Sequence, residues 1–242
     1  TGRYNICPGV DFMATQPNYK GALTQYMTHP EEWTYHIPEG MTTMEGALVE
    51  PAAVGMHAAV LGGAQPGKSI VILGGGTIGL MVLQACISLG ATDITVVDVI
   101  EKRLELAKKL GAARVINGKE EDTVAVLRSE EMYGDHGVDL VFEAAGAVFT
   151  AQQAVQIVSR GGKIMMVGTQ SKPVPIDFLK INREVTIQTS FRYCNNFPQT
   201  IEAISSGRFN VKDMVTNIYD YEDVQKACLL YTSPSPRDKR QS

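Results

Sequence analysis

The chain has 242 residues, of which 44% are hydrophobic and 20% are charged, and its formal net charge at pH 7 is −4. This composition is typical of a globular protein with one or two domains and argues against intrinsic disorder. The acidic balance disfavours general binding to nucleic acid or to anionic membranes. Every apolar run is interrupted before the roughly 18 residues that a membrane span needs. We therefore expect neither nucleic acid nor a membrane among its partners.

The four cysteines show no paired spacing, which argues against a disulfide scaffold and favours a reducing compartment. No charged-then-apolar signal segment opens the chain. A cytoplasmic location is therefore expected. The chain begins with Thr1 in place of methionine, which suggests that it was cut from a longer protein.

Residues 69–190 are expected to alternate between strands and helices. Short β-branched runs predict strands at Ser69–Leu73, Ile94–Asp98, Arg114–Asn117, Val138–Phe142, Lys163–Val167 and Glu184–Thr189. The intervening stretches predict helices at Thr77–Leu89, Glu101–Leu110, Asp122–Tyr133 and Ala151–Ser159, the last closed by Gly161 and Gly162. Apolar strands separated by helices are typical of a parallel sheet covered on both faces. The sequence thus predicts an α/β doubly wound parallel sheet of the Rossmann type.

Residues 1–54 have a different character. They combine turn residues and aromatics with short alternating stretches such as Trp33–Ile37. This composition predicts β-rich structure and loops that belong to a second domain.

A glycine-rich segment follows the first predicted strand and opens the first predicted helix. Gly74, Gly76 and Gly79 have the spacing G-x-G-x-x-G, and Thr77 and Ile78 fill the positions between the last two. This pattern in this context predicts a dinucleotide site, because glycines let the backbone approach a pyrophosphate at a helix N-terminus. A plain glycine turn is the alternative.

Further residues extend this predicted cofactor site. Asp98 ends the next strand and would accept hydrogen bonds from the ribose hydroxyls, and its charge would repel a 2′-phosphate, which favours NAD over NADP. Arg103 could reach the same ribose or the adenine, although a solvated helix arginine fits equally. Val167, Gly168 and Thr169 end the fifth strand, at the sheet edge where ligands bind in this architecture.

The chain resembles the zinc-dependent medium-chain dehydrogenases, and within them the sorbitol (polyol) dehydrogenase branch. Residues 2–8 resemble the end of the structural-zinc lobe, residues 48–58 the segment beside the catalytic zinc, and residues 190–195 the substrate and nicotinamide segment of the polyol branch. The resemblance covers residues 1 to about 227.

The resemblance implies roles for individual residues. Glu50 would be a ligand of the catalytic zinc, directly or through water, and Cys7 a ligand of the structural zinc. Arg192 would contact the polyol or the zinc-bound water, and Tyr193 would line the pocket. His57 is expected to be structural or close to the cofactor rather than a ligand. Zinc would polarise a secondary alcohol, whose carbinol hydrogen passes as hydride to NAD to give a ketose.

The resemblance also implies a domain division. Residues 1–54 would be part of a β-rich GroES-like catalytic domain, residues 55–192 the NAD-binding Rossmann domain, and residues 193–227 the return to the catalytic domain. Residues 228–242 match one reading frame of a transposase adaptor used in sequencing libraries, so we expect a non-native tail, with a natural disordered tail as the alternative. The family commonly forms dimers or tetramers through the sixth strand, here Glu184–Thr189.

The sequence departs from the family at both metal sites. The upstream Cys and His-Glu pair of the catalytic zinc are not in this chain, and neither are three of the four lobe cysteines. A single carboxylate or thiolate cannot hold Zn²⁺, which takes roughly three or four ligands. We therefore expect a parent NAD- and zinc-dependent polyol dehydrogenase and an inactive 242-residue chain. The alternatives are another zinc alcohol or threonine dehydrogenase, or a non-catalytic dinucleotide-binding module.

Overall fold

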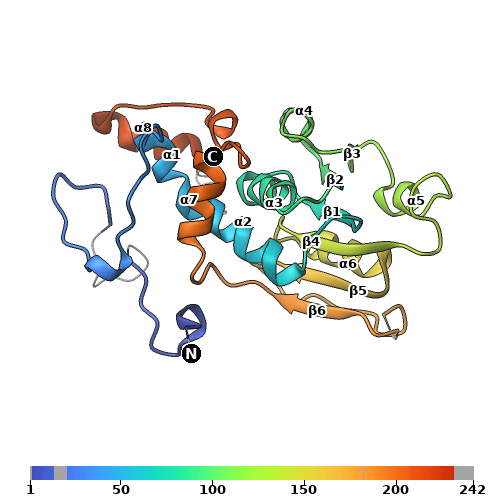
Figure 1. Cartoon of the computed structure of the whole chain (residues 1–242). Coiled ribbons are helices and arrows are strands. Elements are labelled where there is room, and N and C mark those ends of the chain that lie inside the picture. Colours follow the sequence, from blue (N-terminus) through green and yellow to red (C-terminus); the bar gives the residue numbers. More distant parts are fainter. Residues whose placement is uncertain (1, 14–20, 182, 232–242) are drawn as a thin grey trace, which may run out of the picture. The chain divides into compact units, whose positions relative to one another are not determined.

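The structure is a computed structural model that describes residues 2–13, 21–181 and 183–231 (Figure 1). The chain divides into two compact units, Thr1–Val211 and Lys212–Ser242. Within the described residues of the second unit, two single 3-10 turns precede helix α8, Val224–Tyr231. The predicted tail lies in α8 up to Tyr231, and its remaining residues, 232–242, lie outside the described residues.

A six-stranded parallel sheet forms the centre of the first unit, in the order β3-β2-β1-β4-β5-β6. The strands are β1 Ser69–Leu73, β2 Asp93–Asp98, β3 Arg114–Asn117, β4 Val138–Glu143, β5 Val158–Met166 and β6 Thr186–Thr189. The chain moves outward from β1 to β3 and then returns to place β4 on the other side of β1. This reversal of strand order is the switch point of a doubly wound sheet, so the predicted fold class is confirmed.

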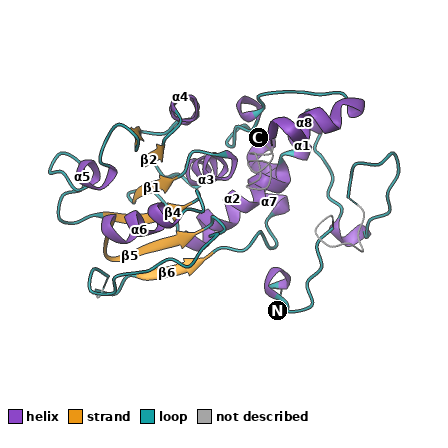
Figure 2. Cartoon of the chain, turned by 180° about the vertical axis from the view of Figure 1, so that it is seen from behind, coloured by secondary structure: helices purple, strands orange, loops and turns teal. Residues whose placement is uncertain are grey.

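Helices cover both faces of the sheet (Figures 1 and 2). The helices of the first unit are α1 Thr43–Ala47, α2 Val49–Gly62, α3 Thr77–Ser88, α4 Glu101–Lys109, α5 Thr123–Leu127, α6 Val148–Ile157 and α7 Phe197–Ser205. None of the helices described is long and apolar enough to cross a membrane.

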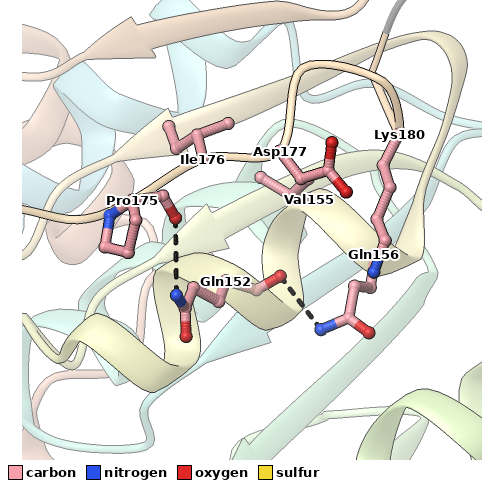
Figure 3. A pocket seen from close by; sticks show the side chains of 7 residues that line it. All are labelled: Gln152, Val155, Gln156, Pro175, Ile176, Asp177 and Lys180. Atoms are coloured by element: carbon pink, nitrogen blue, oxygen red, sulfur yellow. Dashed lines mark hydrogen bonds between the residues drawn. The ribbon is translucent and has the colours of Figure 1, made fainter.

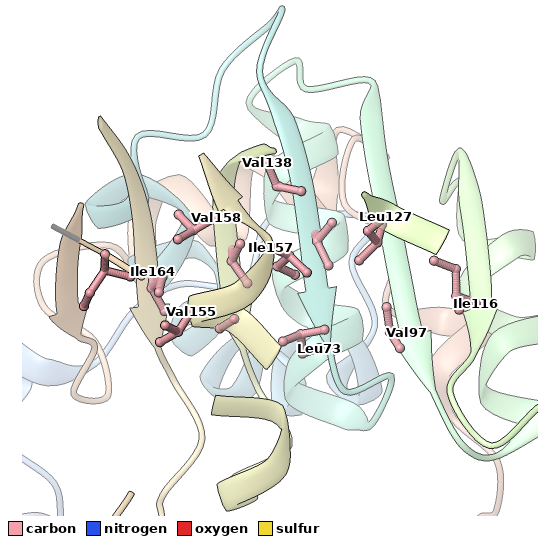
Figure 4. Close-up of a cluster of buried hydrophobic side chains, with 13 residues drawn as sticks. Leu73, Val97, Ile116, Leu127, Val138, Val155, Ile157, Val158 and Ile164 are labelled. Atoms are coloured by element: carbon pink, nitrogen blue, oxygen red, sulfur yellow. The ribbon is translucent and has the colours of Figure 1, made fainter. Parts of the chain in front are cut away.

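The two faces of the sheet have separate apolar layers because successive strand residues point to opposite sides. Val71 and Leu73 of β1 face α5 and α6, where they join a buried cluster that includes Leu127 and Ile157 (Figure 4). On the opposite face, Gly62 of α2 lies against the ring of Phe142. The continuous apolar strands of the sequence follow from this burial on both sides.

The predicted helix Asp122–Tyr133 was too long, because α5 ends at Leu127 and turns follow. Arg128 fixes this region through tertiary hydrogen bonds, with its guanidinium donating to the carbonyls of Gln156 and Val158 at 3.0 Å. Tyr133 contributes at the other end, where its hydroxyl accepts a 2.8 Å bond from Arg114. These long-range partners override the local helical pattern.

The predicted helix Ala151–Ser159 was also wrong at its end. Helix α6 ends at Ile157, and Val158 already pairs with Val138 as the first residue of β5. Gly161 and Gly162 therefore lie inside the strand, where the register of β4 and β5 shifts. Gly161 has φ +70°, a conformation that glycine adopts at little cost, and its N–H donates to Arg183 O at 2.9 Å.

The expectation of β-rich structure in residues 1–54 is not met by the described residues of this segment. They form two 3-10 turns, Tyr4–Ile6 and Glu31–Trp33, the helix α1 and the start of α2. The alternating stretch Trp33–Ile37 pairs with no strand among the described residues, and a strand needs a partner for its backbone hydrogen bonds. The predicted domain boundaries stay predictions.

Asp139, at the start of β4, gives a pH-dependent contribution to stability. Its carboxylate accepts 2.9 Å bonds from the N–H and the hydroxyl of Ser69. Burial alone would raise the pKa of Asp139, but these bonds, the charge of Lys68 and a bond from His136 together lower it below its ordinary value. Because the folded pKa is the lower one, this stabilisation is complete above about pH 4 and is lost as the pH falls through the folded pKa.

We therefore expect Asp139→Asn to lower the free energy of unfolding at pH 7 and to have a smaller effect at pH 3. Urea unfolding of both proteins at the two pH values measures this difference. An equal loss at both values would contradict the assignment.

Candidate functional site

The loop between β1 and α3 contains Gly74 and Gly76, while Gly79 lies in the first turn of α3, and each of these three predicted glycines has its own steric environment. Gly74 has φ +109°, and a Cβ there would lie 2.8 Å from the backbone nitrogen of Ala145. A Cβ on Gly79 would overlap the carbonyl oxygen of Gly74. Gly76 differs, because a Cβ there would meet no atom within 4 Å. There is therefore no room for a side chain at Gly74 or Gly79, whereas the space beside Gly76 is open.

Gly76 is the N-cap of α3 and has no side chain with which to satisfy the first N–H groups of the helix. Thr77 and Ile78 form the first turn, in which no acidic side chain is present. The N–H groups of a first turn lack helical partners and carry the positive end of the helix dipole. The open side of the loop therefore suits an anionic group such as a pyrophosphate.

Asp98 lies at the end of β2 and is only 8% exposed. Its Oδ2 accepts a 2.7 Å hydrogen bond from the N–H of Gly75, while its Oδ1 accepts bonds of 2.8 and 2.9 Å from Val99 and Ile100. The carboxylate is thus fixed directly beside the glycine-rich loop. The contact with Gly75 was not expected from the sequence.

Arg103 also reaches this carboxylate, as its Nη1 lies 3.4 Å from Asp98 Oδ2. The arginine side chain is 48% exposed, so the contact is long and largely in solvent. A carboxylate offers about four acceptor positions, and the three backbone N–H groups and Arg103 use all of them. A ribose hydroxyl that binds Asp98 would therefore take the place of Arg103.

The predicted segment Val167–Thr169 follows β5 and lies against the loop that follows β4. The N–H groups of Val167 and Gly168 donate to the carbonyl of Glu143 at 2.9 and 2.8 Å. Gly168 is closely surrounded, since a Cβ there would lie 2.7 Å from Gly146 Cα. Because Gly74 contacts Ala145, the predicted cofactor residues after β1 and β5 both adjoin the loop after β4.

Glu50 and Tyr193 are brought together by α2 and the segment after β6. Glu50 is in the first turn of α2 and is exposed, and its carboxylate interacts with the Tyr193 hydroxyl. Burial, followed by the negative charge of Glu50, raises the pKa of Tyr193 to about 12. The phenol therefore keeps its proton at neutral pH. Its ring packs edge-on against Phe197, with centroids 5.0 Å apart.

Arg192 has φ +51° and turns toward the N-terminal segment. Its guanidinium carbon lies 4.1 Å from the centre of the Phe12 ring and 5.9 Å from that of Phe191. Asn5 fixes the same region by donating to Phe191 O at 2.9 Å, and it lies 3.5 Å from His57 Nε2. Burial, followed by the charge of Arg3, lowers the pKa of His57 and favours its neutral form.

The residues described do not make a complete zinc site. They contain no group of three or more histidine, cysteine, aspartate or glutamate side chains that could hold a metal ion. Cys7 is an exposed free thiol after the first 3-10 turn. Glu50 and Cys7 therefore cannot bind zinc as this family does by themselves, and their metal roles stay predictions.

A separate cavity of about 250 Å³ lies beside α6 and contains none of the predicted site residues (Figure 3). Its lining is mixed polar and apolar, and in it the Gln152 amide donates to Pro175 O at 3.4 Å and the Gln156 amide to Gln152 O at 3.3 Å. Asp177 and Lys180 border it from the segment after β5. It has no counterpart among the sequence predictions.

Residues 77–206 match the zinc-binding dehydrogenase family, which is more than half of the chain. The chain belongs to this family. It is 66% identical over 226 residues to the uncharacterized zinc-type alcohol dehydrogenase-like protein YdjJ of Escherichia coli (strain K12), covering 93% of this chain and 65% of the relative. It is 41% identical over 229 residues to sorbitol dehydrogenase of Bacillus subtilis (strain 168), and the match covers 93% of this chain and 64% of that relative.

A solved structure with the same backbone arrangement comes from Escherichia coli. It is an oxidoreductase/dehydrogenase of unknown specificity involved in membrane biogenesis, with a TM-score of 0.91 and 65% identity over 93% of this chain and 65% of that one. The chain thus spans about 65% of the length of the zinc-binding dehydrogenases that it matches. The resemblance found in the sequence is confirmed at the level of the family.

Sequence reasoning missed one buried carboxylate of this family member, Glu143. It ends β4 as Asp98 ends β2, and both strands finish at the same edge of the parallel sheet. An acidic residue at a strand end, followed within three positions by Gly146, is the signal that was available in the sequence.

Proposed function

We propose that this chain is the dinucleotide-binding part of an NAD-dependent, zinc-dependent dehydrogenase that oxidises a secondary alcohol of a polyol. The observation that carries the cofactor proposal is the 2.7 Å bond between Asp98 Oδ2 and the N–H of Gly75. It fixes a buried carboxylate beside an open, glycine-lined helix N-terminus. That pairing suits the ribose and the pyrophosphate of one dinucleotide.

NAD supplies the hydride acceptor when it is bound. The residues of this chain would act around it, with the first turn of α3 binding the pyrophosphate and Asp98 orienting the ribose. The negative charge of Asp98 disfavours the 2′-phosphate of NADP, which supports NAD as the preferred cofactor. Glu50 and Tyr193, which interact with each other, would border the substrate side.

The polyol substrate is supported by two features of different kinds. The segment Ser190–Asn195 resembles that of the polyol branch, and the chain is 41% identical to a protein named sorbitol dehydrogenase. Another zinc alcohol dehydrogenase or a threonine dehydrogenase is the alternative within the enzyme class. Because the described residues lack a complete metal site, we propose that the chain alone binds NAD without turnover.

Self-association is also proposed, through the free edge of β6. This strand is the last of the sheet and pairs only with β5 among the described residues. Val185 and Ile187 pack against the buried cluster, so the backbone of the strand rather than these side chains would form the contact. A homodimer or homotetramer would join the sheets of two copies.

Calorimetric titration of the purified chain with NAD⁺ and with NADP⁺ tests the cofactor proposal. We expect NAD⁺ to bind at least about tenfold more tightly, a difference of about 1.4 kcal/mol. Asp98→Asn should reduce this preference to about threefold or less, because it removes the charge and keeps one acceptor oxygen for the backbone. Asp122→Asn is the matched control, since Asp122 caps α5 through bonds to Val124 and Ala125 outside the site.

Equal affinity of the wild-type chain for the two nucleotides would contradict the role of Asp98. Turnover is tested separately by adding zinc and a polyol such as sorbitol or xylitol with NAD⁺. No formation of NADH is expected, and zinc-dependent polyol oxidation by the chain would refute the proposal that it is inactive alone.

A further inference from the structure

Glu143 is a fully buried carboxylate with 0% exposure at the end of β4. Its Oε1 accepts hydrogen bonds from the N–H groups of Ala145 and Gly146 at 3.0 and 2.9 Å and from the hydroxyl of Thr150 at 2.7 Å. Its Oε2 accepts a 2.7 Å bond from the side-chain amide of Gln170. One carboxylate therefore binds donors from the loop after β4, from α6 and from the loop after β5.

The backbone of Glu143 connects the same two loops, since its carbonyl accepts bonds from Val167 and Gly168. The loops also touch directly through glycines. A Cβ on Gly146 would lie 2.7 Å from Thr169 O, and one on Gly168 would lie 2.8 Å from Glu143 Oε2. The two loops thus form a single closely packed layer with the carboxylate beneath it.

The position of this layer relates it to the cofactor site. In the strand order β3-β2-β1-β4-β5-β6, Asp98 lies on β2 and Glu143 on β4, on opposite sides of the glycine-rich loop after β1. A dinucleotide that binds across the switch point with its adenosine at Asp98 must place its other half against the loops after β4 and β5. Glu143 itself has no exposed surface, so it acts on that half only through the loops.

We propose that Glu143 is a positioning residue that fixes these two loops for the nicotinamide riboside half of the dinucleotide. The inference rests on the proposed NAD-binding function and deepens it. Removing the Glu143 carboxylate leaves four donors without an acceptor. The desolvation cost of these unpaired donors is larger than the net stability that their hydrogen bonds contribute. The loops would then lose their fixed geometry, while the pyrophosphate and adenosine contacts at α3 and Asp98 would remain.

The side chain of Gln170 allows the hydrogen-bond acceptor role of Glu143 to be tested separately from its negative charge. Its Oε1 is buried and has no hydrogen-bond partner among the described residues. With glutamine at position 143, the Gln170 amide can turn over so that this free oxygen accepts from the new amide. Glu143→Gln should therefore rescue much of what Glu143→Ala loses.

The experiment compares the affinity of each variant for NAD⁺ and for ADP, which contains only the adenosine and pyrophosphate part. For Glu143→Ala we expect NAD⁺ binding about tenfold weaker and ADP binding within twofold of wild type. For Glu143→Gln, NAD⁺ binding should stay within threefold. Asp139→Asn is the matched control, because it changes a hydrogen-bonded carboxylate at the opposite end of the same strand and should alter neither affinity.

Equal weakening of NAD⁺ and ADP, or no weakening of either, would overturn the role of Glu143. If wild type binds neither ligand, the proposed function itself fails, and the inference fails with it. Should Glu143→Ala not fold, Gln170→Ala decides the question, since it removes one donor at the edge of the layer. It should weaken NAD⁺ about threefold and leave ADP unchanged, and unchanged NAD⁺ affinity would overturn the proposal.

Discussion

Gly76→Val is expected to weaken NAD⁺ binding by at least about 100-fold, close to 3 kcal/mol. A Cβ at this position meets no protein atom within 4 Å, so the valine side chain occupies the open space in front of α3. That is the space in which we place the pyrophosphate. The backbone of Gly76, with φ −72° and ψ −176°, is an extended conformation that valine adopts without strain.

The loss of affinity should therefore come without a large loss of stability. Valine is a poorer N-cap than glycine by less than about 1 kcal/mol, so the melting temperature should fall by no more than about 4 °C. Gly9→Val is the matched control, because a Cβ on Gly9 also meets nothing within 4 Å and Gly9 lies outside the glycine-rich loop. An unchanged NAD⁺ affinity in Gly76→Val would place the pyrophosphate elsewhere.

Gly55→Ala is expected to lower the free energy of unfolding by about 3 kcal/mol, at the upper end of the usual cost of overpacking. Gly55 lies in α2 against the backbone of α3, where a Cβ would be 2.5 Å from the carbonyl carbon of Met81 and 2.8 Å from the nitrogen of Val82. Both neighbours are main-chain atoms of a helix, so neither can move aside alone.

Glycine to alanine at an open helix position stabilises a protein by about 1 kcal/mol. A loss of stability in Gly55→Ala would therefore report the close contact with α3 rather than helix propensity. Urea unfolding measures the change, with Val60→Ala on the exposed side of α2 as the control. Val60→Ala should stay within about 0.5 kcal/mol of wild type. A stabilised Gly55→Ala protein would show that the two helices do not approach as closely as the structure has them.

The sequence predicted the elements best where the local pattern and the final burial agree. Strands β1 and β3 have the expected bounds, Ser69–Leu73 and Arg114–Asn117. The pattern failed at residues 128–137, where the shape depends on the distant carbonyls that Arg128 binds. It failed again at Val158, which the sequence predicts near the end of a helix. In the structure Val158 pairs with Val138 as the first residue of β5.

The candidate site divides in the same way. The glycine-rich loop and Asp98 could be predicted because their spacing follows directly from one strand, one turn and one helix. For Glu143 the sequence offers only an acidic residue at a strand end, and its role could not be predicted because its four donors come from residues 145–170 and meet only in the folded chain. The orientation of Arg192 toward Phe12 was equally inaccessible, since it depends on a left-handed backbone and on a segment 180 positions earlier.

The close approach of α2 and α3 also has a consequence for motion. Helix α2 carries Glu50 in its first turn, and α3 begins at the glycine-rich loop, so the proposed substrate-side carboxylate and the proposed phosphate-binding turn belong to one closely packed pair of helices. Because the contact of Gly55 with Met81 and Val82 leaves no space between the two helices, we expect the distance between these two points to stay the same when a dinucleotide binds.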